Sequence, residues 1–249
     1  MIIIKNNKEI DLMRSAGKIV AETLLLIEEK VRPGITTAEL DRIAEEFITK
    51  HGARPSFKGL YGFPASLCIS VNEQVVHGIP GGYVLKDGDI VSVDCGANIN
   101  GFHGDAARTF GVGSITKEAE RLINVTEESF FKGIEYAKVG NRLTDISHEI
   151  QNCVEAAGFS VVRDFVGHGI GRVVHEDPDI PNYGRPGRGP KLVEGMALAI
   201  EPMVNVGNYK VKTLSNDWTV VTSDGSLSAH YENTIVILPD GPEILTLIR

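Results

Sequence analysis

The feature of this sequence that most constrains its fold is an internal repeat. Apolar residues at helical spacing occupy residues 8–30 and 36–51, and the same order of helix, Gly-containing link and helix returns at residues 117–137 and 143–157. In the second helix of each pair, four positions align at an offset of 106: Leu40 with Ile146, Ala44 with Ile150, Phe47 with Cys153 and Ile48 with Val154. The matched helix pairs predict two similar half-units.

The repeat continues beyond the helices. The segment VLKDGDIVSVD aligns with KLVEGMALAIE at an offset of 107, so that Asp94 falls on Glu201 and a carboxylate ends an apolar strand in each half. We expect an α+β fold in which two half-units, about residues 1–115 and 116–249, are related by a pseudo-twofold axis around a curved antiparallel sheet. No linker divides the chain, which indicates a single domain over residues 1–249.

The composition is that of an ordinary soluble globular protein, with 42% hydrophobic and 23% charged residues. The net charge of -8 argues against a nucleic-acid partner, because such partners select basic surfaces. No apolar run approaches the ~20 residues of a membrane span, and the apolar start is too short for a signal peptide. The three cysteines form no CxxC pair, which fits a reducing compartment. Together these observations predict a cytoplasmic protein without a membrane or nucleic-acid partner.

The segment VDCGANINGFHGD places two aspartates on either side of a predicted hairpin turn. If Ile99 and Asn100 form the turn, Asp94 faces Asp105 directly; if Asn100 and Gly101 form it, Asp105 lies diagonal to Asp94. In both cases the two carboxylates lie on one face of the hairpin within side-chain reach. Like charges this close are destabilising when buried, so the pair requires a cation, a shared proton or an exposed position.

Three further segments bring metal-ligand residue types to predicted strands. FVGHGIGRVVHEDP holds His168 among glycines, LAIEP contains Glu201, and AHYENTIVIL starts an apolar strand with Glu232, where an unpaired carboxylate would be costly if buried. With Asp94 and Asp105, these residues form a set of four acids and one imidazole. Such a set suits a pair of divalent ions such as Mn, Fe, Co or Zn, which can activate a bridging water.

At this point the sequence resembles type I methionine aminopeptidases, which have the pita-bread fold. The resemblance covers nearly the whole chain and is carried, in order, by VNEQVVHGIP, VDCGANINGFHGD, FVGHGIGRVVHEDPDIPNY, LAIEPM and HYENT. Nothing resembles the zinc-binding extension of longer eukaryotic forms or the insertion of type II enzymes, so the chain looks like the short bacterial form. The resemblance implies a dinuclear metal-dependent hydrolase that removes the N-terminal methionine from nascent proteins with a small second residue.

The resemblance also implies roles for single residues. Asp94 would chelate one metal, Asp105 and Glu232 would bridge both, and His168 and Glu201 would hold the other. Glu201 would also handle the protons of the attacking water. The two ions would be Co, Mn, Fe or Zn, and ligand chemistry does not choose between them.

Two further histidines carry over from the family pattern. His77, in VVHGIP, looks like the residue beside the scissile amide that exchanges a proton with the leaving nitrogen. His175 looks like the residue that stabilises the carbonyl oxygen as it gains charge. Phe63, Cys68 and Trp218, together with His77, resemble the wall of the pocket for the methionine side chain.

The chain departs from the family pattern in that pocket. Leu60 stands where the family often has Tyr, and Val174 stands where it often has a larger residue. For Phe63 and Trp218, ordinary core packing is the alternative role. Outside the pocket, His103 and His230 share strand parity with Asp105 and Glu232 and are either partners that orient a carboxylate or structural residues. His51 and His148 lie in helical patterns and are assigned no role, and we expect the Pro- and Gly-rich residues 181–195 to line a cleft.

Three other functions compete with the aminopeptidase. A prolidase or aminopeptidase P uses the same five ligands but usually carries a substantial N-terminal domain. A creatinase-like hydrolase works without metals, and a non-catalytic binding module of the same fold typically loses ligands or histidines. The expected partners are nascent polypeptide N-termini, and a role near the ribosome is implied by the family activity alone. We expect the protein to be a monomer.

Overall fold

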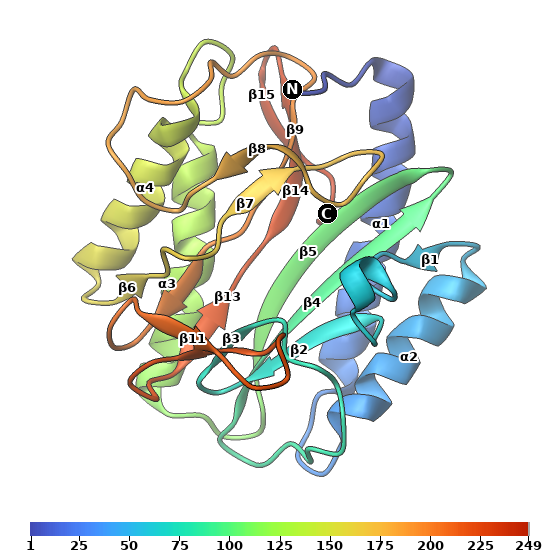
Figure 1. The fold of residues 1–249 in the computed structure, drawn as a ribbon, viewed down its shortest axis with the longest axis vertical. Coiled ribbons are helices and arrows are strands. Elements are labelled where there is room, and N and C mark those ends of the chain that lie inside the picture. The colour runs from blue at the N-terminus through green and yellow to red at the C-terminus, as the bar shows by residue number, and fades with distance from the viewer. Residues whose placement is uncertain (249) are drawn as a thin grey trace.

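The computed structural model describes residues 1–248 (Figure 1). The first half contains, in order, α1 (Asn7–Lys30), α2 (Thr37–Lys50), β1 (Arg54–Pro55), the short 3-10 helix η1 (Leu60–Gly62), β2 (Leu67–Val71), β3 (Gln74–Val76), β4 (Ile90–Ile99) and β5 (Phe102–Gly111). The second half contains α3 (Lys117–Ile134), α4 (Leu143–Ala156), β6 (Ser160–Val161), β7 (Gly167–Gly169), β8 (Glu176–Ile180), β9 (Ala197–Ile200), β10 (Met203–Asn205), β11 (Val211–Thr213), β12 (Val220–Thr222), β13 (Ser228–His230), β14 (Asn233–Leu238) and β15 (Gly241–Ile244).

The helices begin where local capping predicts. Thr36 accepts a hydrogen bond from Glu39 N–H, and the Glu39 carboxylate accepts one from Thr36 N–H, which forms a capping box for α2. Asn6 and Glu9 do the same for α1. These bonds satisfy donors that would otherwise be left free in the first turn, so the two helices start at defined residues.

The internal repeat is present in the structure at the level of backbone conformation. Gly34 and Gly140, which lie within the two links, have φ of 92° and 96°, both in the left-handed region that favours glycine. Gly34 donates its N–H to Leu85 O, and Gly140 donates to Leu192 O, the residue aligned with Leu85. In Figure 1 the α1–α2 and α3–α4 pairs lie on opposite sides of the strands. The predicted α+β pita-bread fold with two related half-units is confirmed.

The strands form antiparallel sheets that meet between the two helix pairs. In the first half, β1, β4 and β2 pair in that order and β5 pairs with β4; in the second half, the order is β15-β14-β9-β7-β8. The halves are joined where Ala107 and Glu232 exchange backbone hydrogen bonds of 3.3 and 3.0 Å, and where Thr109 Oγ1 donates to His230 O. This seam runs beside the residues predicted to bind metal.

Each half has its own hydrophobic core. The apolar faces of α1 and α2 pack on β2 and β4 around residues such as Leu40 and Val93, and α3 and α4 pack on β9 and β14 around residues such as Ile146 and Leu198. No helix among residues 1–248 is long and apolar enough to cross a membrane.

One expectation about a loop is wrong. Residues 181–195 were expected to line a cleft, but none of them lines the large cavity of the described chain. The loop instead lies against the start of α4, where Gly187 N–H donates to Asp145 Oδ1 and Arg188 N–H donates to Thr144 Oγ1. Its glycines serve tight turns on the surface of the second half.

Candidate metal centre

The β4–β5 hairpin decides how the two aspartates meet. Asp105 is paired with Gly96, and Asp94 with Ala107, so the turn is Asn100–Gly101. Of the two predicted registers, the one that places the aspartates diagonally is correct. Both side chains therefore project from the same face of the hairpin, and they are close enough for a hydrogen bond between the two carboxyl groups.

The other three predicted ligands come from the second half. His168 lies on β7 opposite Ala199 of β9, Glu201 directly follows β9, and Glu232 lies between β13 and β14. The backbone exchange between Glu232 and Ala107 sets the second-half acid against the hairpin that carries Asp94 and Asp105. The structure thus brings together all five residues, which are as many as 138 positions apart in the chain.

Four of these five residues, together with His230, form two overlapping groups of donor atoms, and Asp94 belongs to neither group. The donor atoms of Asp105, His168 and Glu232 lie within 4.8 Å of one another, and so do those of Glu201, His230 and Glu232. His168 Nε2 is 3.6 Å from Glu201 Oε1, which links the two groups. Since Glu232 belongs to both, its carboxylate is placed to be shared between two cations.

Burial makes this cluster electrostatically unfavourable without a cation. It raises the pKa of Asp94 to about 7 and that of Glu201 to about 8. Burial, followed by the charges of neighbouring carboxylates, also raises the pKa of Asp105 and of Glu232 well above the usual range. Burial lowers the pKa of His168 to about 4, so its imidazole is neutral at neutral pH.

The residues present fit a metal centre. The cluster contains buried carboxylate oxygens that have no hydrogen-bond partner among residues 1–248, namely Asp94 Oδ1, Asp105 Oδ1 and Glu232 Oε1. His168 Nδ1 lies 2.9 Å from Gly169 O and must donate to it, which leaves the Nε2 lone pair free to face the acids. Within the described chain, no Lys or Arg lines the cavity into which they open. Oxygen donors with one neutral nitrogen and no protein cation are the chemistry that divalent metals bind.

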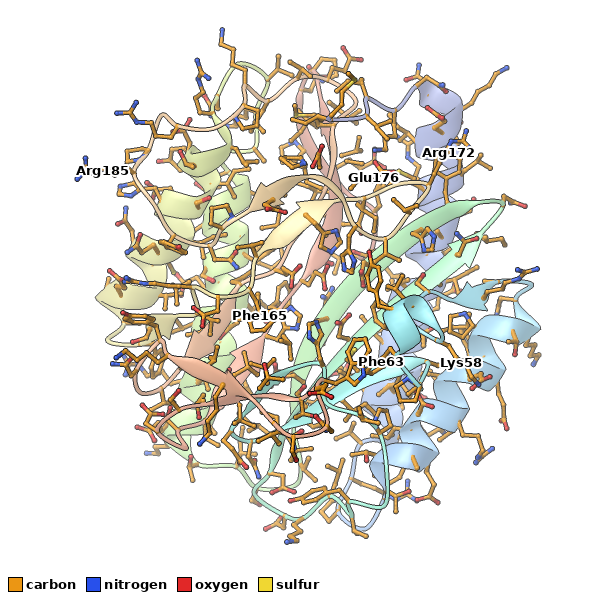
Figure 2. All side chains as sticks on the ribbon, in the orientation of Figure 1. Lys58, Phe63, Phe165, Arg172, Glu176 and Arg185 are labelled. Carbon is orange, nitrogen blue, oxygen red and sulfur yellow. The ribbon has the colours of Figure 1, made fainter. Side chains whose placement is uncertain are left out.

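The five residues of the cluster line a cavity of about 520 Å³. One wall is apolar: Phe63, Cys68 and Trp218 pack in one cluster, with the Phe63 and Trp218 rings edge-to-face at 5.0 Å. Phe165 lines the cavity from the second half and Phe63 from the first, as Figure 2 shows by their positions among the strands. The predicted pocket residues are therefore on the cavity wall and are not ordinary core residues remote from it.

The two residues that depart from the family pattern belong to the same apolar cluster. Leu60 lines the cavity, and Val174 is buried beside it. Phe57 also lines the cavity and was missed by the sequence reasoning. The only signal for Phe57 is an indirect one, the glycine at position 96. A Cβ at Gly96 would lie 2.9 Å from the Phe57 ring, so Gly96 makes room for that ring.

The two predicted catalytic histidines flank the cluster. His77 has φ of 58° and meets the Phe165 ring edge-to-face at 5.6 Å, and burial lowers its pKa to about 4. His175 is exposed, lies parallel to Tyr61 at 5.9 Å and contacts the His168 ring edge-to-face at 4.5 Å. Both line the cavity. Both imidazoles are neutral at pH 7, since the protein around the partly exposed His175 desolvates its ring enough to lower its pKa as well.

The remaining histidines divide clearly. His230 Nε2 is buried, has no hydrogen-bond partner in residues 1–248, and lies 3.5 Å from Glu201 Oε2 and 3.9 Å from Glu232 Oε2. His103 Nδ1 instead bonds Ser56 Oγ at 2.8 Å, so it does not orient a carboxylate through that atom. His51 Nδ1 bonds a helix carbonyl, and His148 Nδ1 bonds Gly184 O; neither lines the cavity.

Comparison with known proteins agrees with this geometry. The model of metallopeptidase family M24 matches residues 11–239. The chain is 79% identical to a methionine aminopeptidase of Clostridium perfringens over 100% of both chains, and 57% identical to methionine aminopeptidase 1 of Bacillus subtilis, also over 100% of both. A crystal structure of methionine aminopeptidase from Rickettsia prowazekii superposes with a TM-score of 0.98 at 47% identity, covering 99% of this chain and 100% of that one. The chain therefore belongs to metallopeptidase family M24 and, within it, to the methionine aminopeptidases.

Proposed function

We propose that this protein is a metal-dependent hydrolase that removes the N-terminal methionine from polypeptides whose second residue is small. The observation that carries the proposal is the cluster of four acids and one neutral imidazole, with unpaired buried oxygens, in a cavity that has one apolar wall. Membership of the methionine aminopeptidases supports methionine as the residue released.

In this proposal the five clustered residues hold two divalent ions. Asp94 would hold one ion, His168 and Glu201 would hold the other, and Asp105 and Glu232 would contact both; the presence of Glu232 in both donor groups supports its shared role. Bound there, the ions supply Lewis acidity for the amide carbonyl and lower the pKa of the attacking water. Mn, Fe, Co and Zn all suit these donors.

The surrounding residues supply proton transfers. Metal binding requires the deprotonated form of Glu201, and this carboxylate, which lies near His168 and His230, would accept a proton from the attacking water. His77 and His175 are neutral, so each carries one N–H donor. His77 donates a hydrogen bond to the leaving nitrogen, which takes up the proton that Glu201 accepted from the water, and His175 donates a hydrogen bond to the carbonyl oxygen as it gains negative charge.

The apolar wall selects the side chain that is released. Phe57, Phe63 and Trp218 present aromatic surfaces and Cys68 presents sulfur, a lining that suits a flexible thioether. The absence of a cation from the cavity lining of residues 1–248 also leaves nothing to hold an acidic side chain.

The cellular setting follows from the chemistry and belongs to the same proposal. The substrate is the N-terminus of a nascent chain, so we place the protein in the cytoplasm, close to the ribosome. We further propose that it acts as a monomer within a single catalytic domain, because both halves contribute ligands to one centre.

The test is release of methionine from a Met-Ala-Ser peptide by chelator-treated protein, with and without added Mn or Co. Metal-dependent release by the parent protein and by Glu46→Gln, a change in an exposed pair with Arg42, is expected together with its loss in Asp94→Ala. A Gly-Pro peptide is the control for a prolidase. Cleavage of Gly-Pro in place of Met-Ala-Ser would assign the prolidase reaction, and no cleavage of either with any metal would leave a binding protein.

A further inference from the structure

A buried ion pair lies outside the metal centre but next to a residue of the catalytic apparatus. Lys5 Nζ contacts Glu176 Oε2, and the two side chains are only 2% and 3% exposed. Glu176 directly follows His175 in the chain and begins β8. We propose that the Lys5–Glu176 pair is a positioning device that sets the orientation of His175; this inference rests on the proton-donating role proposed for His175.

Glu176 closes the turn that carries His175. Its second oxygen, Oε1, accepts the N–H of Arg172 at 2.8 Å, so one carboxylate binds both the start of the turn and Lys5. Gly171 makes room for this arrangement, because a Cβ there would lie 2.5 Å from Lys5 Cε and 2.7 Å from Glu176 Oε1. Residues 171–176 therefore fold around the ion pair. Figure 2 shows Glu176 and Arg172 at the end of the molecule where α1 starts.

The partner lysine is itself held by the fold. Lys5 N–H donates to Gly195 O at 2.8 Å, and Lys5 Nζ donates to Ile3 O at 2.9 Å. On the other side, His103 N–H donates to Gly171 O at 2.8 Å, which ties the turn to the tip of the β4–β5 hairpin. The turn, which belongs to the second half-unit, is thus anchored to the first by His103 and by Lys5, and Lys5 lies 171 residues away in the chain.

His175 depends on its backbone for its position. Within residues 1–248 its imidazole has no hydrogen-bond partner and touches two rings, those of Tyr61 and His168. Such ring contacts orient an exposed side chain weakly, so the turn that carries it decides where its N–H points. A buried ion pair is a poor source of net stability, because desolvation offsets the attraction between the charges. The ion pair instead holds the turn in a single conformation.

The test uses the metal-loaded, full-length protein and a double variant. Removing one charge alone leaves the other buried and unpaired, so Lys5→Met and Glu176→Gln separately should lower the Tm. In Lys5→Met/Glu176→Gln both charges are absent, and the amide oxygen still accepts the Arg172 N–H. We expect its Tm to approach that of the parent, while kcat for the Met-Ala-Ser peptide falls about 10- to 100-fold, KM stays within about twofold and metal content is unchanged. The His175 ring signal in the NMR spectrum, assigned with His175→Gln, should shift as the ring moves relative to Tyr61.

Arg172→Met is the matched control, because it removes an exposed ion pair with Glu9 from the same turn and leaves the buried pair intact. It should keep kcat within about twofold. A double variant with parental kcat and an unmoved His175 signal would overturn the inference, and so would a fall in kcat that follows loss of metal. If the double variant does not fold, Glu176→Asp, which keeps the charge but shortens its reach, takes its place with the same readouts. If the parent releases no methionine, the proposed function fails instead, and the His175 signal alone then decides the inference.

Discussion

At the scale of single residues, the acids of the metal centre lower the stability of the metal-free protein. Asp105 is 3% exposed and carries an unpaired oxygen next to three other acids. Asp105→Asn should stabilise the metal-free protein by about 1 kcal/mol, because Asn does not need the proton that the buried Asp105 carboxyl must retain on folding. The same change should lower kcat/KM by at least about 100-fold, since a proposed bridging ligand is lost. Calorimetry of chelator-treated protein and peptide assays measure the two effects.

The control at this scale is an aspartate with the opposite environment. Asp224 is on the surface and accepts hydrogen bonds from Asn208 N–H, Ser226 N–H and Ser226 Oγ–H, which lower its pKa to about 2. Asp224→Asn should therefore lower the Tm and leave kcat unchanged. A metal-free Asp105→Asn protein less stable than the parent would contradict the argument about the proton that buried Asp105 retains.

His230 is the residue for which sequence reasoning left two roles open. Its Nε2 lies beside Glu201 and Glu232, so its N–H is placed to orient one of these carboxylates when metal is bound. His230→Leu should weaken metal binding by about 10- to 100-fold, as measured by calorimetric titration of chelator-treated protein with Mn. His51→Gln, a change at an exposed helix residue, should bind metal as the parent does. Equal affinities in the two variants would assign His230 a structural role.

At the scale of elements, the turn of the β4–β5 hairpin sets the register of both aspartates. Asn100 and Gly101 have φ of 55° and 80°, in the region where a side chain with a branched Cβ is strained. Gly101→Val should lower the free energy of unfolding by about 1–2 kcal/mol, as measured by urea denaturation. Gly81→Ala should change it by less than about 0.5 kcal/mol, because Gly81 does not have a positive φ and a Cβ there meets nothing closer than 4.0 Å. Equal effects would show that the turn does not restrain the hairpin.

The elements also show how far sequence reasoning reaches. The repeat predicted both helix pairs because Leu40 and Ile146 occupy the same face in each pair, and both are fully buried. The hairpin turn could not be chosen, because Asn100 is a good turn residue in either register and only the pairing with the rest of the sheet decides between them. Phe57 was missed for a similar reason: an apolar residue in an irregular segment has no periodicity, and its place on the cavity wall depends on Gly96 across the sheet.

At the scale of the whole molecule, joining two halves at one acidic centre couples stability to both metal and pH. In the metal-free protein the folded-state pKa of Asp94 is about 7 and that of Glu201 about 8, whereas in the unfolded chain both acids titrate near their usual values of 3.8 and 4.5. The folded protein therefore retains protons that the unfolded chain has already lost. Since stability falls with rising pH wherever the folded state binds more protons, this contribution is complete below the unfolded pKa values and is lost as pH rises through about 7 and 8.

The buried histidines also change the stability with pH, mainly at the acidic end of this range. His77, His168 and His230 have pKa values lowered to about 4, so their contribution to stability is lost as pH falls below the usual 6.5. As pH rises from 6.5 to 8, the histidines of the unfolded chain lose their remaining protons, so the effect of the acids increasingly dominates. The Tm of chelator-treated protein should fall across this range. The free energy of unfolding should fall by up to about 1.4 kcal/mol per pH unit for each proton that the folded chain retains. Saturation with Mn should remove the fall, because binding displaces these protons from the folded state. Scanning calorimetry at pH 6.5, 7.2 and 8.0, with and without Mn, tests both expectations. A Tm of the metal-free protein that rises with pH would show that the acids are not protonated in the folded chain.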